Sequence, residues 1–283
     1  MADNRQGGEQ RPAGGARGGG PRRDQRGGPR RQAPARSGPN RARRAQPQTG
    51  AGPARGEADA GEKPRGPAIP PDIDAKQLAP EVRRELTTLD KTTADTIARH
   101  LVAAGELIDE DPEAALAHAQ AARTRSGRIA AIREAVGIAA YRCGDWAQAL
   151  AELRAARRMG SKSALLPLIA DCERGVGRPE RAIELARSPE AAALEGDDAD
   201  ELRIVAAGAR ADLGQLEQAL AVLASPAPDP SRTGQTAARL FYAYAEALLA
   251  LGRKDEALQW FLNSGRADID GVTDAEERVS ELA

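Results

Sequence analysis

The chain has 283 residues, a formal net charge of −1 and only 2% aromatic residues. Its first 66 residues hold 14 Arg, one Lys and six acidic residues, so they carry +9 while the remaining residues carry −10. No apolar run approaches the roughly 18 residues that a membrane-spanning helix needs, and no apolar segment of signal-peptide type follows the N-terminus. The sequence therefore argues against a membrane protein and predicts a cytoplasmic one.

Residues 1–66 contain no Val, Ile, Leu, Phe, Trp or Tyr. Such a stretch cannot bury enough apolar surface to offset the entropy of ordering, so we predict a disordered, basic, Arg/Gly/Pro-rich tail. A linker and a leading helix follow over 67–95, with "PEVRRELTTL" from Pro80 as the helix. The rest is rich in Ala and Leu, which favour helices.

Five similar segments recur from Glu110 onward, at spacings of 34, 33, 37 and 38 residues. They are "EDPEAAL" from Glu110, "GDWAQAL" from Gly144, "GRPERAI" from Gly177, "GQLEQAL" from Gly214 and "GRKDEAL" from Gly252. A period of this size is typical of helical solenoids. In each unit we expect the anchor to end a first helix and the following residues to begin a second, with Asp111 as N-cap and Pro112 at the first helical position in the first unit.

Small residues also repeat in register, as expected where two antiparallel helices approach closely. The five sets are Ala103, Ala115 and Ala122; Gly137, Ala149 and Ala156; Ala170, Ala182 and Pro189; Ala207, Ala219 and Pro226; and Ala245, Ala257 and Ser264.

This pattern resembles the tetratricopeptide repeat (TPR) family over roughly 96–271, most closely in 130–163 and in 238–271. In the last unit, large apolar residues also stand where the family places them: Phe241, Tyr244, Leu248 and Phe261. The chain is similar as well to TPR proteins of high-GC Gram-positive bacteria, the actinobacteria. The resemblance implies an all-α fold, an α-solenoid of about five TPR-like helix pairs.

Several positions depart from the family pattern. Pro189 and Pro226 predict that the second helices of units three and four end near Ser188 and Ser225. Pro167 predicts that the first helix of unit three either starts after Ala164 or is kinked. Charged residues occupy positions that the family makes apolar, so the register of units two and four stays open by one residue: Arg133, Arg203 and Arg210.

Two acidic or polar segments lie near the later units. We interpret "EGDDADE", residues 195–201, as a solvated loop that ends at the N-cap Asp200, because its Gly is misplaced for a calcium loop. For residues 272–283 we predict a short polar helix or tail, with Thr273 and Glu276 as a capping box for a helix over 274–282.

The sequence offers little for catalysis. The two histidines, His100 and His118, fall in different predicted helices and leave too few ligands for zinc. No phosphate-binding loop and no nucleophile motif is present. Cys143 and Cys172 lack a CxxC spacing, so we expect reduced, half-buried or core thiols, with a disulfide between neighbouring helices as the less favoured alternative. We therefore expect no enzyme, cofactor or metal site.

The resemblance implies that the first helices line a concave face that holds a peptide. By register, this predicted groove is formed by His100, Glu134, Ile138, Tyr141, Asp171, Arg174, Tyr242 and Glu246. The Lys and Asn that clamp a C-terminal carboxylate in chaperone-binding members are absent, because His100 with Ala104 and Glu134 with Ile138 occupy those positions. The alternative interpretation is an ordinary solvated surface.

The tail can contact nucleic acid or an acidic surface, because Arg binds phosphate oxygens and a flexible chain follows a backbone without reading sequence. The candidate contacts are Arg17, Arg22, Arg23, Arg26, Arg30, Arg31, Arg41, Arg43 and Arg44. A linker shaped only by GC-rich codons is the alternative. The leading hypothesis is a non-catalytic protein-interaction scaffold or adaptor with an unidentified protein or peptide partner. The rival is an RNA- or ribonucleoprotein-binding protein whose tail is primary, and an enzyme or enzyme subunit is remote.

Overall fold

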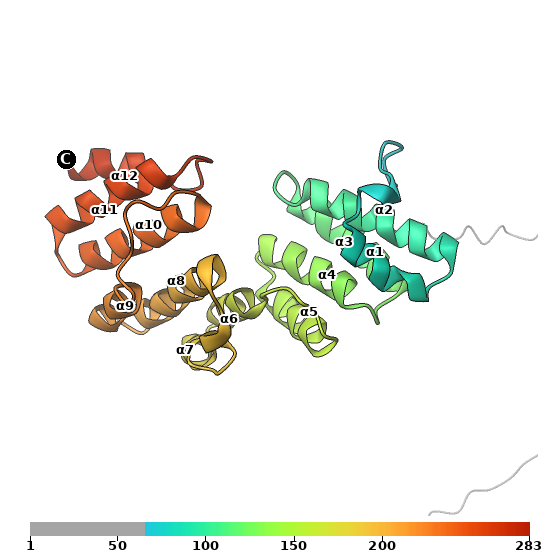
Figure 1. The fold of residues 1–283 in the computed structure, drawn as a ribbon, viewed down its shortest axis with the longest axis horizontal. Coiled ribbons are helices and arrows are strands. Elements are labelled where there is room, and N and C mark those ends of the chain that lie inside the picture. Colours follow the sequence, from blue (N-terminus) through green and yellow to red (C-terminus); the bar gives the residue numbers. More distant parts are fainter. Residues whose placement is uncertain (1–65) are drawn as a thin grey trace, which may run out of the picture. The chain divides into compact units, whose positions relative to one another are not determined.

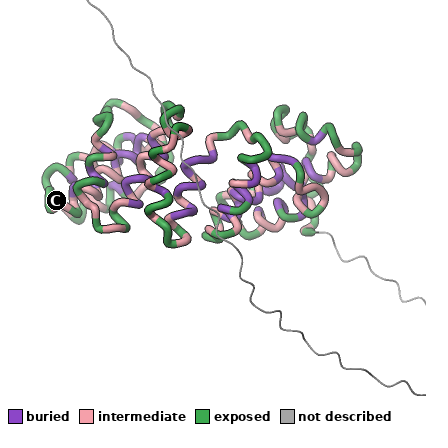
Figure 2. The backbone as a smooth tube through the Cα atoms, turned by 90° about the horizontal axis from the view of Figure 1, so that it is seen from below, coloured by how far each residue is buried: buried purple, intermediate pink, exposed green. Residues whose placement is uncertain are grey.

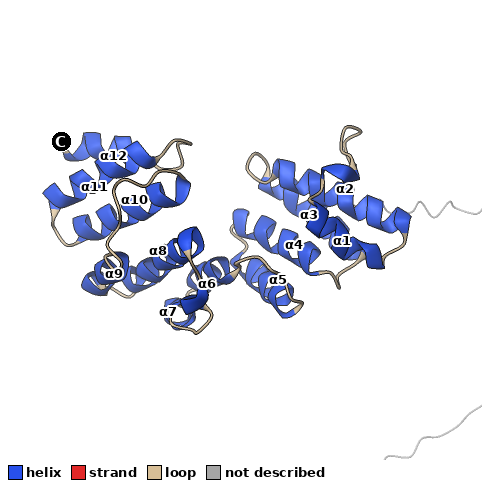
Figure 3. Ribbon diagram, viewed as in Figure 1, coloured by secondary structure: helices blue, strands red, loops and turns tan. Residues whose placement is uncertain are grey.

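The computed structural model describes residues 66–283, so the predicted tail lies outside the described residues except for Gly66. Every regular element in the described part is helical (Figure 3). The elements are η1 (Ala75–Gln77), α1 (Pro80–Glu85), η2 (Leu86–Thr88), α2 (Lys91–Leu107), α3 (Pro112–Arg125), α4 (Ala130–Arg142), α5 (Trp146–Arg158), α6 (Leu166–Gly175), α7 (Pro179–Ala186), η3 (Ala191–Ala193), α8 (Gly196–Asp212), α9 (Leu216–Leu223), α10 (Gln235–Ala250), α11 (Lys254–Ala267) and α12 (Ala275–Leu282).

The helices pack as five consecutive pairs: α2 with α3, α4 with α5, α6 with α7, α8 with α9, and α10 with α11 (Figure 1). Each second helix also contacts the first helix of the next pair. First helices of successive pairs contact each other as well: α6 contacts α8, and α8 contacts α10. This order of contacts is that of a helical solenoid. The predicted all-α solenoid of five pairs is confirmed, and the residues from Pro80 onward form α1 followed by η2.

The four predicted turns share one backbone geometry. Gly144, Gly177, Gly214 and Gly252 have φ of 73°, 76°, 71° and 76°, a left-handed conformation that favours glycine. In the first of these turns the Gly144 amide donates to the Tyr141 carbonyl and the Asp145 amide donates to the Ala140 carbonyl. The other three turns repeat both hydrogen bonds. This is the Schellman motif, which satisfies the last carbonyls of a helix.

The small residues of the repeat lie where the paired helices touch. The residues at the first two positions of every unit are buried, and so are those at the third position of units one, two and five. At Gly137 an added Cβ would lie 2.7 Å from Cγ of Leu153 and 3.1 Å from its backbone nitrogen. Only glycine therefore allows α4 and α5 to approach this closely.

Burial follows the inner faces of the paired helices (Figure 2). The largest fully buried side chains include Phe241, Phe261, Ile132 and Leu153. The core is a series of clusters that each join neighbouring helices, for example α5 with α6 through Leu153 and Ile169. Burial of this kind explains why a chain so poor in aromatic residues still folds.

The prolines act as predicted. Helix α7 ends at Ala186 and α9 ends at Leu223, before Pro189 and Pro226 respectively. Helix α6 starts at Leu166 with Pro167 in its first turn, so the alternative of a start after Ala164 is the correct one. Asp111 caps α3 by accepting from the Ala114 amide.

Two local predictions were wrong. Residues 196–201 belong to α8 instead of a loop, and Asp200 is buried inside that helix. Carboxylates in the first turn of a helix interact favourably with its dipole, and Asp200 is paired with Arg203 and Arg232. Helix α12 forms as expected, but Thr273 does not cap it, because its hydroxyl donates to Asp268.

The arginines that left the register open each donate to polar groups of the chain. Arg133 donates to the Gly127 carbonyl and to Glu152. Arg203 donates to Asp200 and to the backbone carbonyls of Leu223, the last residue of α9, and of Pro226. Arg210 donates to Gln215. The register inferred from the small residues therefore holds, with guanidinium groups at positions that the family makes apolar.

Buried carboxylates hold neighbouring helices together. Glu152, Glu173 and Asp200 are 4%, 1% and 5% exposed, and each lies between two arginines. Glu173 of α6, for example, pairs with Arg154 of α5 and with Nε of Arg178 at 2.8 Å. A buried carboxylate is tolerated only when it is paired in this way.

Candidate functional site

Four first helices contribute side chains to one cavity of about 360 Å³. Its apolar lining includes Ile138 of α4, Leu168 of α6 and Val205 of α8. Its polar lining comes from the same helices and from α10, in the residues Tyr141, Arg142, Asp171, Asp198, Glu201 and Arg239. The cavity thus crosses four successive repeats on the side formed by the first helices.

Polar contacts connect each of these helices to the next. The Tyr141 hydroxyl on α4 donates to Asp171 of α6 at 2.7 Å. Arg174 of α6 donates to Asp212 of α8 at 2.8 Å and also pairs with Asp171.

The contact between Arg174 and α8 depends on a glycine. A Cβ at Gly208 would lie 2.7 Å from Cζ of Arg174, so the guanidinium rests directly against α8. The next bridge joins α8 to α10, where Arg239 pairs with Glu201 at 3.0 Å.

These contacts and the burial of the groups set their protonation. Burial raises the pKa of Tyr141, and its hydrogen bond to Asp171 adds to the effect. The pKa of Glu201 is raised by burial, against the opposing effect of Arg239. Tyr141 is therefore a neutral hydroxyl at physiological pH.

Three of the eight residues predicted to form the groove line this cavity: Ile138, Tyr141 and Asp171. Arg174 lies next to it, bound to Asp171 and Asp212. Glu134 is engaged elsewhere, because it accepts from the hydroxyls of Ser161 and Ser163, both at 2.7 Å.

His100 was wrongly predicted to be exposed. It is 2% exposed, and its Nδ1 lies 3.0 Å from Nδ1 of His118 on the neighbouring helix. The reason is that α3 packs closely on α2 through small residues, which encloses the imidazole. Burial lowers the pKa of His100 to about 4, with Arg125 and His118 contributing, so the ring is neutral.

Tyr242 and Glu246 lie at the far end of the array, under α12. Arg278 of α12 pairs with Glu246 at 2.8 Å and stacks on Phe261, and Tyr242 packs edge-on against the same ring. The terminal helix thus partly covers the two predicted groove residues of the last unit.

Sequence reasoning missed the lining from α8 and α10, namely Asp198, Glu201, Val205 and Arg239. Glu201 and Arg239 are 38 residues apart, the same spacing that separates Gly214 from Gly252. Opposite charges one repeat apart on first helices were the signal that could have identified this pair. Treating residues 195–201 as a loop concealed it.

Among the described residues, no helix has the length and apolarity to span a membrane. Within the same residues, no group of His, Cys, Asp and Glu has an arrangement that could hold a metal ion. Cys143 and Cys172 are free thiols, and burial raises the pKa of Cys172 to about 12. The thiol of Cys172 is therefore protonated and unreactive at neutral pH.

Comparison with known proteins relates part of the repeat array to a known family. A family model described as a tetratrico peptide repeat matches residues 169–270. Among solved structures, the chain is similar to YrrB, described as a TPR protein with an unusual peptide-binding site, at 18% sequence identity and a TM-score of 0.42 over 68% of this chain and 94% of that one. A comparison with curated proteins found no significant match. The match thus relates residues 169–270 to the tetratricopeptide repeats, and the Schellman turns and buried small residues of the matched units recur in units outside the match.

Proposed function

We propose that the cavity formed by α4, α6, α8 and α10 binds an extended segment of a partner protein, so that the chain acts as a non-catalytic interaction scaffold. The supporting observation is that four first helices line one cavity of about 360 Å³. That volume lies within the range of about 300–1,000 Å³ seen for binding pockets. Repeat arrays use such continuous faces to bind other proteins.

The lining favours a segment with an apolar side chain next to a basic one. Ile138, Leu168 and Val205 offer apolar contact. Asp198 is an exposed carboxylate that pairs with no Lys or Arg among residues 66–283, whereas Asp171 and Glu201 already have arginine partners. A Lys or Arg of the partner would therefore find its counterion at Asp198.

Selection of peptides from a random library against the full chain tests this proposal. We expect selected peptides to share an apolar residue near a Lys or Arg. Asp198→Arg should weaken binding of such a peptide at least tenfold, and replacing its basic residue with Glu should restore binding to the variant. The matched control is Glu217→Arg, since Glu217 is also an exposed carboxylate in the first turn of a helix, outside the cavity.

Selected peptides that bind the Asp198→Arg variant as well as the original chain would contradict the proposal. A peptide whose basic residue is replaced with Glu and that still fails to bind the Asp198→Arg variant would also contradict it.

We also propose a second, separate role for residues 1–66, supported by their charge of +9. The nine arginines named above would contact phosphate groups of RNA without sequence preference. This role is independent of the cavity, and its test by salt dependence is described in the Discussion.

A further inference from the structure

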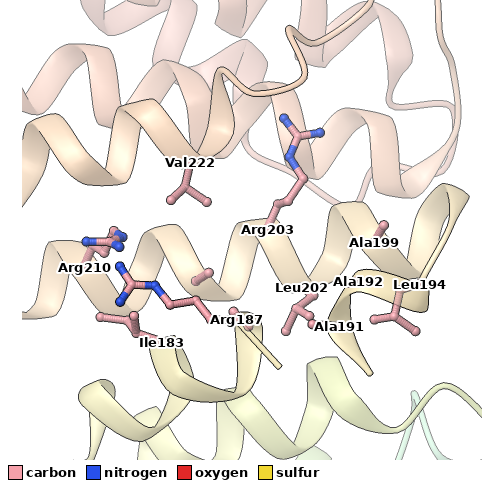
Figure 4. Close-up of a pocket in the computed structure, with 12 residues that line it drawn as sticks. Ile183, Arg187, Ala191, Ala192, Leu194, Ala199, Leu202, Arg203, Arg210 and Val222 are labelled. Carbon is pink, nitrogen blue, oxygen red and sulfur yellow. The ribbon is translucent and has the colours of Figure 1, made fainter. Parts of the chain in front are cut away.

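A second cavity of about 330 Å³ lies beside α8, between α7, η3 and α9 (Figure 4). It shares no lining residue with the cavity formed by α4, α6, α8 and α10. It therefore offers a binding site separate from the proposed peptide site.

This cavity exists because two second helices are short. Helices α7 and α9 have 8 residues each, whereas α5 has 13 and α11 has 14. Since Pro189 and Pro226 follow their ends, neither helix continues along α8. The short η3 segment only partly fills the space that remains, and it lines the cavity with Ala191 and Ala192.

One side of the cavity carries positive charge without a counterion. Figure 4 shows Arg187, at the end of α7, extending toward Arg210 of α8. Arg210 donates only to the neutral Gln215 among the described residues, and no carboxylate within residues 66–283 forms an ion pair with Arg187 or Arg210. Two like charges that face each other are repulsive, and an anion bound between them would remove that repulsion.

A third arginine borders the same space. Arg203 donates to Asp200 and to the backbone carbonyls of Leu223 and Pro226, and its Nε is buried without an acceptor. This unused donor adds to the positive potential of the cavity. The sequence had singled out Arg203 and Arg210 as departures from the apolar family pattern, and both line this cavity.

The rest of the lining is apolar. It is formed by Leu194, Leu202, Val222 and several alanines, and among the described residues around the cavity only the arginines bring polar side chains. A peptide in this space would leave its amide groups without partners, which is unfavourable. An aliphatic chain has no such groups and would gain by burial against these residues.

We propose that this cavity binds a free aliphatic carboxylate. The carboxylate lies between Arg187 and Arg210, where guanidinium groups form charge-assisted hydrogen bonds to it, and the hydrocarbon chain lies against Leu194 and Leu202.

Titration calorimetry of the full chain with octanoate tests the site. For a ligand of about ten non-hydrogen atoms we expect a dissociation constant of about 0.1–1 mM with one site per chain. Octanol, which lacks the charge, and acetate, which lacks the chain, should each bind at least tenfold more weakly. Arg187→Gln and Arg210→Gln should each weaken octanoate about tenfold, the effect of losing one charged hydrogen bond.

The matched control is Arg158→Gln, because Arg158 is an exposed arginine at the end of α5, away from the cavity. It should leave octanoate binding unchanged. Circular dichroism of each variant separates loss of binding from loss of fold.

A chain that binds octanol as well as octanoate, or that keeps its affinity in both arginine variants, would overturn the proposal. Failure to bind octanoate at 5 mM, roughly fivefold above the upper dissociation constant expected, would do the same. If an acetylated peptide ending in Leu binds more tightly than octanoate, the ligand of this site would instead be the C-terminus of a protein.

Discussion

At Gly137 the backbones of α4 and α5 come close enough to exclude any side chain. We expect Gly137→Ala to destabilise the fold by about 1–3 kcal/mol, because the new Cβ would overlap Leu153 and crowd its backbone nitrogen. The steric penalty exceeds the gain of about 1 kcal/mol that Ala brings to a helix interior. Urea unfolding followed by circular dichroism measures the difference.

Gly105→Ala is the control for this substitution. Gly105 lies in α2 with no atom within 4 Å of an added Cβ, so the same change there should stabilise by about 0.5–1 kcal/mol. Shifts of the same sign in the two variants would show that helix propensity, and not the contact with Leu153, decides the outcome.

The buried pair of His100 and His118 makes stability depend on pH. The pKa of His100 is lowered to about 4 by burial, against about 6.5 in an unfolded chain, so the unfolded state binds more protons between these values. The stabilisation is complete above about pH 6.5 and is lost as the pH falls toward 4.

We therefore expect the free energy of unfolding to fall between pH 7.5 and pH 5. His100 should contribute at most about 1.4 kcal/mol to this fall for each pH unit, the value for one extra proton bound by the unfolded chain, and His118, whose pKa is also lowered by burial, adds to it. His100→Gln should reduce this pH dependence, because Gln does not titrate. Denaturant titrations of both proteins at the two pH values measure it, and identical pH profiles would contradict this role of His100.

At the scale of elements, the buried carboxylates between neighbouring helices contribute to the free energy of unfolding. Glu173 is 1% exposed and pairs with Arg154 and Arg178, so Glu173→Gln should destabilise by about 1–3 kcal/mol. Both arginines are more than a third exposed, and water can therefore solvate them once the carboxylate is gone, which keeps the loss below the larger values for fully buried pairs.

Glu184→Gln provides the comparison, because Glu184 forms an exposed ion pair with Arg181 on the same helix. Such pairs contribute little, so a change below about 0.5 kcal/mol is expected. Thermal melts of the two variants give the difference, and equal melting temperatures would mean that burial of Glu173 adds nothing.

The elements that could be predicted from sequence are those fixed by local signals. Glycine anchors, in-register small residues and prolines act over a few positions, and they located the turns and helix ends correctly. The start of α8 was missed because Asp200 is stabilised by Arg232, which lies 32 residues away in the chain. Thr273 was misassigned for a similar reason, since Asp268 competes successfully for its hydroxyl.

For the candidate site, the register selected Ile138, Tyr141 and Asp171, which line the cavity, but also His100, which is buried. Repeat position alone cannot predict exposure, because exposure depends on how closely the next helix packs. The cavity lined by Arg187 and Arg210 was also beyond sequence reasoning, although the prolines that create it were recognised.

At the scale of the whole molecule, the charge of +9 on residues 1–66 gives the proposed RNA binding a testable dependence on salt. If six to nine of the nine arginines contact phosphates, the log–log dependence of affinity on salt should have a slope of about −4 to −6. Fluorescence anisotropy with single-stranded RNA between about 50 and 300 mM salt measures this slope.

Replacing the nine arginines with Gln in the full chain should abolish both the binding and its salt dependence. RNA affinity that is unchanged in this variant would show that the arginines of residues 1–66 do not bind RNA. A full chain that fails to bind at about 50 mM salt would have the same consequence.

The recurring Schellman turns allow the number of repeats in the array to change. Cys143 is followed by Gly144 with φ of 73°, and Val176 is followed by Gly177 with φ of 76°. Removal of residues 144–176 would join Cys143 directly to Gly177, with one left-handed glycine taking the place of another. Because the turns have the same backbone geometry, a segment one repeat long, such as α5 with α6, can be duplicated or excised between two of them during evolution or by design with that geometry restored at the junction.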